Sequence, residues 1–138
     1  MGKLYLVSIG PGALDMITPR ACEALKKCQI IIGHQLYLDL IQTLIQDKIQ
    51  IATPWGDEIE RVDIAINKTI EGNDVSLISS GDIGIYGLGG LALERLGENN
   101  LDINYEIIPG ITSANACASI LGAPLAHDFL TLSLSDLL

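Results

Sequence analysis

The chain has 138 residues, 49% of them hydrophobic and 18% charged, with a net charge of −9 at pH 7. This length and apolar content predict one domain with a buried core, and the acidic balance disfavours an electrostatic grip on nucleic acid. No uncharged apolar run approaches the roughly 18 residues of a membrane span, and the N-terminus lacks a signal-peptide pattern, so we expect a cytoplasmic protein with no membrane partner.

Short apolar runs alternate along the chain with stretches of helical periodicity. Strands are expected at residues 3–9, 29–33, 48–53, 74–79 and 104–110, with a last strand at 129–135. Helices are expected at residues 19–27, 36–45, 58–71, 90–96 and 113–121. In the third of these helices, Ile59, Val62, Ile66 and Ile70 fall on one face. The alternation predicts an α/β domain with a mainly parallel five-stranded sheet and helices on both faces.

Three of the expected strands are followed by glycine-bearing loops. These loops are GPG (10–12), SGDIGIYG (80–87) and PGITSA (109–114). Ligands of open parallel sheets bind beyond the carboxyl ends of the strands, where such loops gather. The sequence therefore predicts a small-molecule site formed by the three loops.

The loops do not match the common phosphate-binding motifs. Gly10-Pro11-Gly12 begins like a dinucleotide fingerprint, but residue 15 is Asp, and proline lacks the N–H that could face a pyrophosphate. The second loop carries Asp82 and no basic residue. This favours a ligand with little negative charge, or a cationic one, that donates hydrogen bonds to Asp82. The alternative is a local role, in which Asp82 caps the next helix or makes an Asx turn.

The three cysteines, Cys22, Cys28 and Cys117, are odd in number and have no C-x-x-C spacing. They are expected to be small buried side chains without redox or metal roles. No set of His, Cys and carboxylate residues has metal-ligand spacing, so no metal site is expected.

Four segments together resemble the tetrapyrrole methylase family. They are VSIGPGALDMIT, SSGDIGIYG, IIPGITSANACASILGAPL and HDFLTLSLSDLL, in the order in which the family has them. Within the family, the SSGD–GIYG and SLSDLL segments are most similar to the enzymes that methylate C17 of precorrin-3B or cobalt-factor III in cobalamin biosynthesis. The resemblance implies use of S-adenosyl-L-methionine, contraction of the tetrapyrrole ring, and a homodimer. Residues 1–138 would be the N-terminal domain, with the family's C-terminal domain absent from this chain.

The resemblance also implies particular site residues. It places the cofactor on the second and third loops, at Gly81, Asp82, Ile85, Thr112, Ser113 and Ala114. Pro11, in the first loop, would face the substrate, and Asp82 would accept hydrogen bonds from the ammonium group of the methionine part.

The residue that assists ring contraction is not identified by the resemblance. Asp136 and His127 are candidates by chemistry; the alternatives are a helix N-cap for Asp136 and a hydrogen-bonded loop residue for His127. His34 stands where the family commonly has tyrosine, and Tyr37 is interpreted as a packing residue.

Two classes of function remain open from the sequence. The first is the methyltransferase, or its N-terminal half, with either precorrin-3B or the cobalt-bearing cobalt-factor III as substrate. The second is a non-catalytic α/β module that binds a ligand or forms oligomers.

Overall fold

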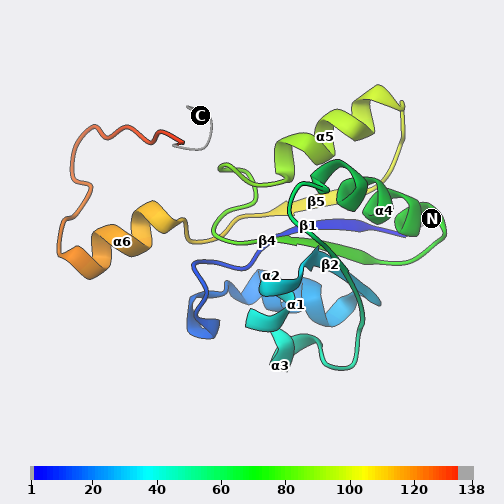
Figure 1. Cartoon of the computed structure of the whole chain (residues 1–138), viewed down its shortest axis with the longest axis horizontal. Coiled ribbons are helices and arrows are strands. Elements are labelled where there is room, and N and C mark those ends of the chain that lie inside the picture. Colours follow the sequence, from blue (N-terminus) through cyan, green and yellow to red (C-terminus); the bar gives the residue numbers. More distant parts are fainter. Residues whose placement is uncertain (1, 134–138) are drawn as a thin grey trace.

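The computed structural model describes residues 2–133. Five parallel strands form one sheet in the order β3-β2-β4-β1-β5 (Figure 1). The strands are β1 (Leu4–Ser8), β2 (Ile30–His34), β3 (Ile49–Thr53), β4 (Val75–Ser79) and β5 (Tyr105–Ile108). The expected parallel five-stranded sheet is confirmed.

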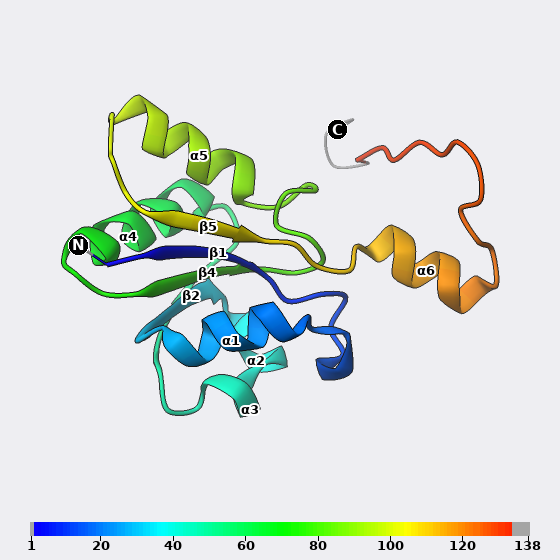
Figure 2. The same cartoon turned by 180° about the vertical axis from the view of Figure 1, so that it is seen from behind.

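Helices cover both faces of the sheet. One face packs against α1 (Pro19–Lys27), α2 (Gln35–Leu40) and α3 (Gln42–Ile45), and the other against α4 (Glu58–Ile70) and α5 (Gly89–Glu98) (Figures 1 and 2). Successive residues of a strand point to opposite faces, so Tyr5 and Val7 enter the first core while Leu4 and Leu6 enter the second. The central strands β1, β2 and β4 are buried on both faces and read as largely apolar runs, whereas the edge strands β3 and β5 are partly exposed.

The sixth helix, α6 (Ser113–Leu121), does not cover the sheet. It extends beyond the carboxyl ends of the strands in both views, and none of its residues is buried (Figures 1 and 2). Residues 122–132 are exposed and turn back toward the loop after β4, where the hydroxyl of Tyr86 donates to the carbonyl of Thr131 (Figure 1). No helix in the described part of the chain is long and apolar enough to cross a membrane.

Two expected elements differ in the structure. The helix expected at 36–45 is broken at Ile41, whose ψ of 15° and 3.2 Å bond from its N–H to the carbonyl of Leu38 form a tight turn that redirects the chain toward β3. The strand expected at 129–135 is not formed by residues 129–133, which have no neighbouring strand to pair with; residues 134 and 135 lie outside the described residues.

The buried face of α4 also differs from the expected apolar face. Val62 and Ile66 are buried as expected, but Ile59 and Ile70 are 58% and 44% exposed. Arg61 is buried instead, because its guanidinium bonds to Thr53 and Pro54 at the end of β3. The helix is therefore rotated relative to its isoleucine pattern.

Candidate functional site

The loops after β1 and β4 are joined directly to each other. Gly10 N–H donates to the carbonyl of Gly81 at 3.1 Å, and Gly81 N–H donates back to the carbonyl of Gly10 at 2.7 Å. Both glycines have positive φ values, 72° and 62°, which L side chains rarely adopt. The glycines thus allow the first two loops to meet at the carboxyl edge of the sheet.

Asp82 connects the second loop to the third. Its Oδ1 accepts from the N–H of Gly84 at 2.8 Å, which is an Asx turn, and its Oδ2 accepts from the N–H of Gly110 at 2.9 Å. A Cβ on Gly110 would collide with the carbonyl oxygen of Gly81 and with Ser8 Cβ, so the loops approach as closely as glycine permits. The local role considered for Asp82 is therefore present in the structure.

The three loops surround a hollow of about 480 Å³. It is lined by the residues to which the sequence assigned cofactor or substrate contacts: Pro11, Gly81, Asp82, Ile85, Thr112, Ser113 and Ala114. Asp82 is the only charged residue among those lining it, within the part of the chain that the structure describes. We call this space the loop hollow.

Other residues of the loop hollow were not singled out from the sequence. They are Ser79, Ser80, Tyr86, Asn115, Phe129 and Thr131. Ser80 and Tyr86 lie within the quoted SSGDIGIYG segment and could have been named from it. Phe129 and Thr131 lie within the quoted HDFLTLSLSDLL segment, but their place at the hollow depends on the path of the chain after α6; there the hydroxyl of Tyr86 donates to the carbonyl of Thr131 at 3.0 Å.

Of the two residues proposed for ring contraction, only His127 lies within the described residues. His127 is exposed in the segment after α6 and does not line the hollow. Asp136 lies outside the described residues. Tyr37 packs against the core, as interpreted from the sequence, and also lines the hollow. His34 caps α2, its Nδ1 accepting from the N–H of Leu36 at 3.1 Å.

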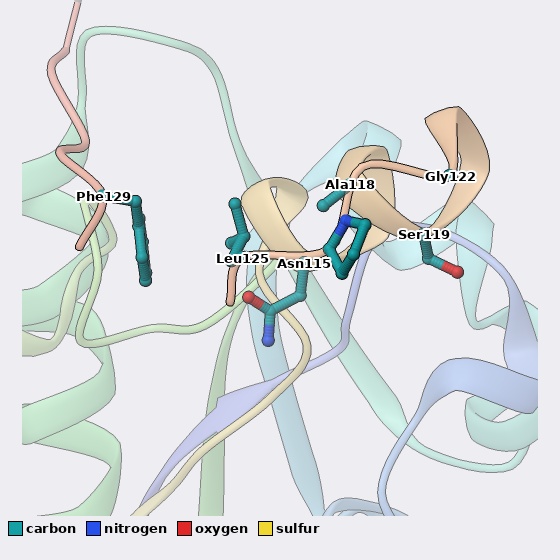
Figure 3. Close-up of a pocket in the computed structure, with 7 residues that line it drawn as sticks. Asn115, Ala118, Ser119, Gly122, Leu125 and Phe129 are labelled. Atoms are coloured by element: carbon teal, nitrogen blue, oxygen red, sulfur yellow. The ribbon is translucent and has the colours of Figure 1, made fainter. Parts of the chain in front are cut away.

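A second space, of about 730 Å³, lies beside α6 (Figure 3). Asn115, Ala118 and Ser119 border it from the helix, and Leu125 and Phe129 border it from the following segment (Figure 3). No charged side chain lines it among the described residues. Since Asn115 and Phe129 also line the loop hollow, the two spaces adjoin each other.

The three cysteines differ in burial according to where they lie in the fold. Cys28 is buried between α1 and the sheet, and burial raises the pKa of its thiol to about 11. Cys22 is half-buried, whereas Cys117 is exposed, so the expectation of three buried cysteines is wrong for Cys117 because α6 leaves the sheet. Residues 2–133 hold no group of three or more His, Cys, Asp or Glu side chains placed to bind a metal ion.

A parallel sheet with glycine loops meeting around a hollow at its carboxyl edge is typical of α/β domains that bind small molecules. The chain belongs to the Tetrapyrrole (Corrin/Porphyrin) Methylases, whose family model matches residues 3–137. It is 47% identical to the "Probable cobalt-factor III C(17)-methyltransferase" of Salmonella typhimurium over 98% of this chain and 56% of that protein.

Solved structures share the fold. The crystal structure of the methyltransferase CobJ matches with a TM-score of 0.91 and 32% identity, over 99% of this chain and 57% of that chain. Uroporphyrin-III C-methyltransferase from Thermus thermophilus, complexed with S-adenyl homocysteine, matches with a TM-score of 0.74 and 25% identity, over 91% of this chain and 50% of that chain. The chain thus spans about half the length of these proteins.

Proposed function

We propose that this chain forms the N-terminal part of a methyltransferase that uses S-adenosyl-L-methionine to methylate C17 of cobalt-factor III or precorrin-3B, with ring contraction, in cobalamin biosynthesis. The observation that carries the proposal is the loop hollow, which is lined by all seven residues assigned from the sequence, with Asp82 as its one carboxylate among the described residues. The name of the Salmonella relative supports the reaction, and the neighbour complexed with S-adenyl homocysteine supports the cofactor.

The residues of the loop hollow fit the charge of this cofactor. S-adenosyl-L-methionine carries an ammonium group and a sulfonium, and the charged residue that borders the hollow is the acid Asp82. Each oxygen of Asp82 already accepts one backbone N–H, and a carboxylate oxygen has capacity for a second donor. Asp82 can therefore hold the loops and accept from an ammonium group at the same time.

The remaining contacts would come from both loops. Gly81 and Ile85 would contact the cofactor from the second loop, and Thr112, Ser113 and Ala114 from the third. Thr112 Oγ1 accepts from the N–H of Asn115 at 3.2 Å as the N-cap of α6, which leaves its hydroxyl hydrogen available to a ligand.

Methyl transfer from this cofactor needs little general acid–base catalysis by the protein. When bound, the cofactor supplies a methyl group on a positively charged sulfur, which an electron-rich ring carbon attacks in line. The tasks of this chain are then to hold the two reactants in register and to keep water out, with Pro11 on the substrate side of the hollow. Asp136 and His127 remain the candidates for assisting ring contraction.

We also propose a cytoplasmic homodimer. Ile120, Leu121, Leu130 and Leu132 are 67–81% exposed at the end of the molecule formed by α6 and the segment after it. Large apolar side chains left exposed on neighbouring segments favour association. Light scattering at rising concentration should approach twice the monomer mass of 14.8 kDa, and a constant monomer mass would contradict the dimer.

Calorimetric titration of the chain tests the cofactor assignment. S-adenosylhomocysteine should bind, whereas ATP and NAD should not, because their phosphates would meet Asp82 and no cation in the loop hollow. Binding of ATP or NAD in place of S-adenosylhomocysteine would overturn the methyltransferase and favour a ligand-binding module of another kind.

A further inference from the structure

A third hollow, of about 340 Å³, lies beside the loop hollow at the ends of β3 and β4. Tyr37, Ser79 and Tyr86 line both spaces, so they share a wall. The remaining wall includes Trp55 and Glu58, before and at the start of α4, and Arg61 on the first turns of α4. We call this space the arginine hollow.

Arg61 is a buried cation with no ion-pair partner. It is 2% exposed, and no carboxylate oxygen in residues 2–133 lies within the 4.0 Å of an ion pair with its guanidinium. Its bonds go to uncharged oxygens: Nε donates to Thr53 Oγ1 at 2.5 Å, and Nη2 donates to the carbonyls of Thr53 and Pro54 at 3.4 and 2.7 Å. Nη1 takes part in none of them.

A buried guanidinium without an ion pair carries an unfavourable desolvation free energy, which a bound anion would offset. Every fully buried side-chain nitrogen or oxygen of the described residues has a partner, so Nη1, which has none, is not fully buried, and Arg61 lines the arginine hollow. A guanidinium fixed by other bonds presents its free N–H groups in the geometry that suits a carboxylate.

The other wall of the arginine hollow is aromatic. Trp55 stacks on His34 with ring centroids 4.0 Å apart and meets Tyr37 edge-on at 5.6 Å, yet it remains 59% exposed. Tyr86 is 64% exposed and has a φ of 54°, which is uncommon for a tyrosine. Exposed aromatic rings held in place by their neighbours are suited to contact a flat ring.

We propose that the arginine hollow binds one carboxylate-bearing pyrrole ring at the rim of the tetrapyrrole, with the carboxylate on Arg61 and the ring against Trp55. The inference rests on the proposed function, because it assumes that a tetrapyrrole lies across the adjoining loop hollow. Glu58 faces the same space, and its Oε1 accepts from the N–H of Gly56 at 3.2 Å. Its charge opposes that of Arg61, so the anion preference depends on Arg61.

Nitrogen-detected NMR of the labelled chain tests this site directly. Trp55 is the only tryptophan of the sequence, so its indole N–H gives a single signal, and the Nε–H of Arg61 is a second local reporter. Metal-free uroporphyrin III, a tetrapyrrole with carboxylates around its rim, is the probe. Saturable shifts of both signals are expected, with ring-current effects on the indole. Binding that leaves both signals unmoved, or no binding, would overturn the inference.

Variants of Arg61 and Glu58 test whether uroporphyrin binding depends on the charges of the arginine hollow. Arg61→Gln should weaken uroporphyrin binding at least about tenfold, the size of a lost charge-assisted hydrogen bond, whereas Glu58→Gln should tighten it. Arg95→Gln is the matched control, because Arg95 is paired with Asp63 and Glu98 away from the hollow. Since Arg61→Gln also removes bonds to β3, Trp55→Leu provides a second variant at an exposed position and should weaken binding about fivefold. Unchanged affinity in a folded Arg61→Gln or in Trp55→Leu refutes the site.

Two further titrations separate this inference from the proposed function. Benzoate should bind far more weakly than uroporphyrin, and equal affinities would reassign the hollow to small aryl carboxylates. S-adenosylhomocysteine should shift the signals of Gly81 and Ala114 and leave the Arg61 dependence of uroporphyrin binding intact. Failure of S-adenosylhomocysteine to bind refutes the proposed cofactor, whereas loss of the Arg61 dependence refutes the arginine hollow alone.

Discussion

Replacing Asp82 with asparagine keeps the size of the side chain and removes its charge. Asparagine usually serves an Asx turn as well as aspartate does, but here both carboxylate oxygens accept backbone N–H groups, from Gly84 and Gly110. An asparagine must turn its NH₂ group toward one of these donors. The variant therefore loses one charge-assisted hydrogen bond and weakens the other, which costs about 1–3 kcal/mol of unfolding free energy, or roughly 4 °C in Tm per kcal/mol.

The same substitution should weaken S-adenosylhomocysteine binding by about ten- to a hundredfold, since the ammonium group loses a charged acceptor. Calorimetry measures the affinity and thermal unfolding measures the stability. Ser8→Ala is the matched control. Ser8 Oγ is buried and accepts from the N–H of Ile83 at 2.8 Å, so its loss loosens the same loop without removing the carboxylate.

The two variants distinguish contact from support. If Asp82 touches the ligand, Asp82→Asn loses much more affinity than Ser8→Ala at a comparable loss of Tm. Equal losses of affinity would mean that Asp82 acts only by holding the loops. Unchanged affinity in Asp82→Asn would refute the electrostatic reasoning for the loop hollow altogether.

Three further predictions concern the domain that carries the site. Gly110→Ala should lower both Tm and the affinity for S-adenosylhomocysteine, because its Cβ would force the loops apart. Gly90 has open space around it, so Gly90→Ala should change the free energies of unfolding and of binding by no more than about 1 kcal/mol. Hydrogen bonds from Lys3 and Arg20 hold the pKa of Glu106 below its ordinary value, so its stabilisation is present at neutral pH and is lost as the pH falls below about 4.5 through the lowered pKa. Unfolding curves of Glu106→Gln should accordingly change less between pH 5 and about pH 3 than those of the parent chain. With the pKa of its thiol raised to about 11, Cys28 should resist a thiol reagent at about pH 8 in the native protein while Cys117 reacts, and fast labelling of Cys28 would contradict its burial.

The fold was largely predictable because the three central strands are buried on both faces. Five apolar runs with helical patterns between them permit few arrangements other than a parallel sheet with crossover helices. The predictions that were wrong concern features that depend on tertiary packing. A strand at 129–133 would have needed an edge to pair with, and the chain had already left the sheet through α6. Cys117 lies within a segment of clear helical periodicity, but periodicity does not show what the helix packs against, so it could not predict that Cys117 is exposed.

The loop hollow was predictable to the extent that it depends on strand ends. Gly10, Gly81 and Gly110 follow strands that are neighbours in the sheet, so the general rule for parallel sheets brings their loops together. Tyr37 and Phe129 could not be placed in the same way. Tyr37 reaches the hollow from α2, where its orientation depends on how that helix packs, and Phe129 reaches it from a segment whose path is set by the direction of α6.

The orientation of α4 is set by the hydrogen bonds of Arg61 and not by the apolar periodicity of the helix. Apolar periodicity alone would turn Ile59 and Ile70 toward the sheet, and burying an isoleucine is worth about 1.5–3 kcal/mol. The structure leaves both side chains largely exposed and buries Arg61, which holds the carbonyl groups at the end of β3. Bonds to a charged donor, at about 1.5–3 kcal/mol each, can offset the exposed isoleucines. They leave a guanidinium with no carboxylate oxygen of residues 2–133 within ion-pair distance, beside an aromatic hollow, and a carboxylate-bearing ring would complete this arrangement.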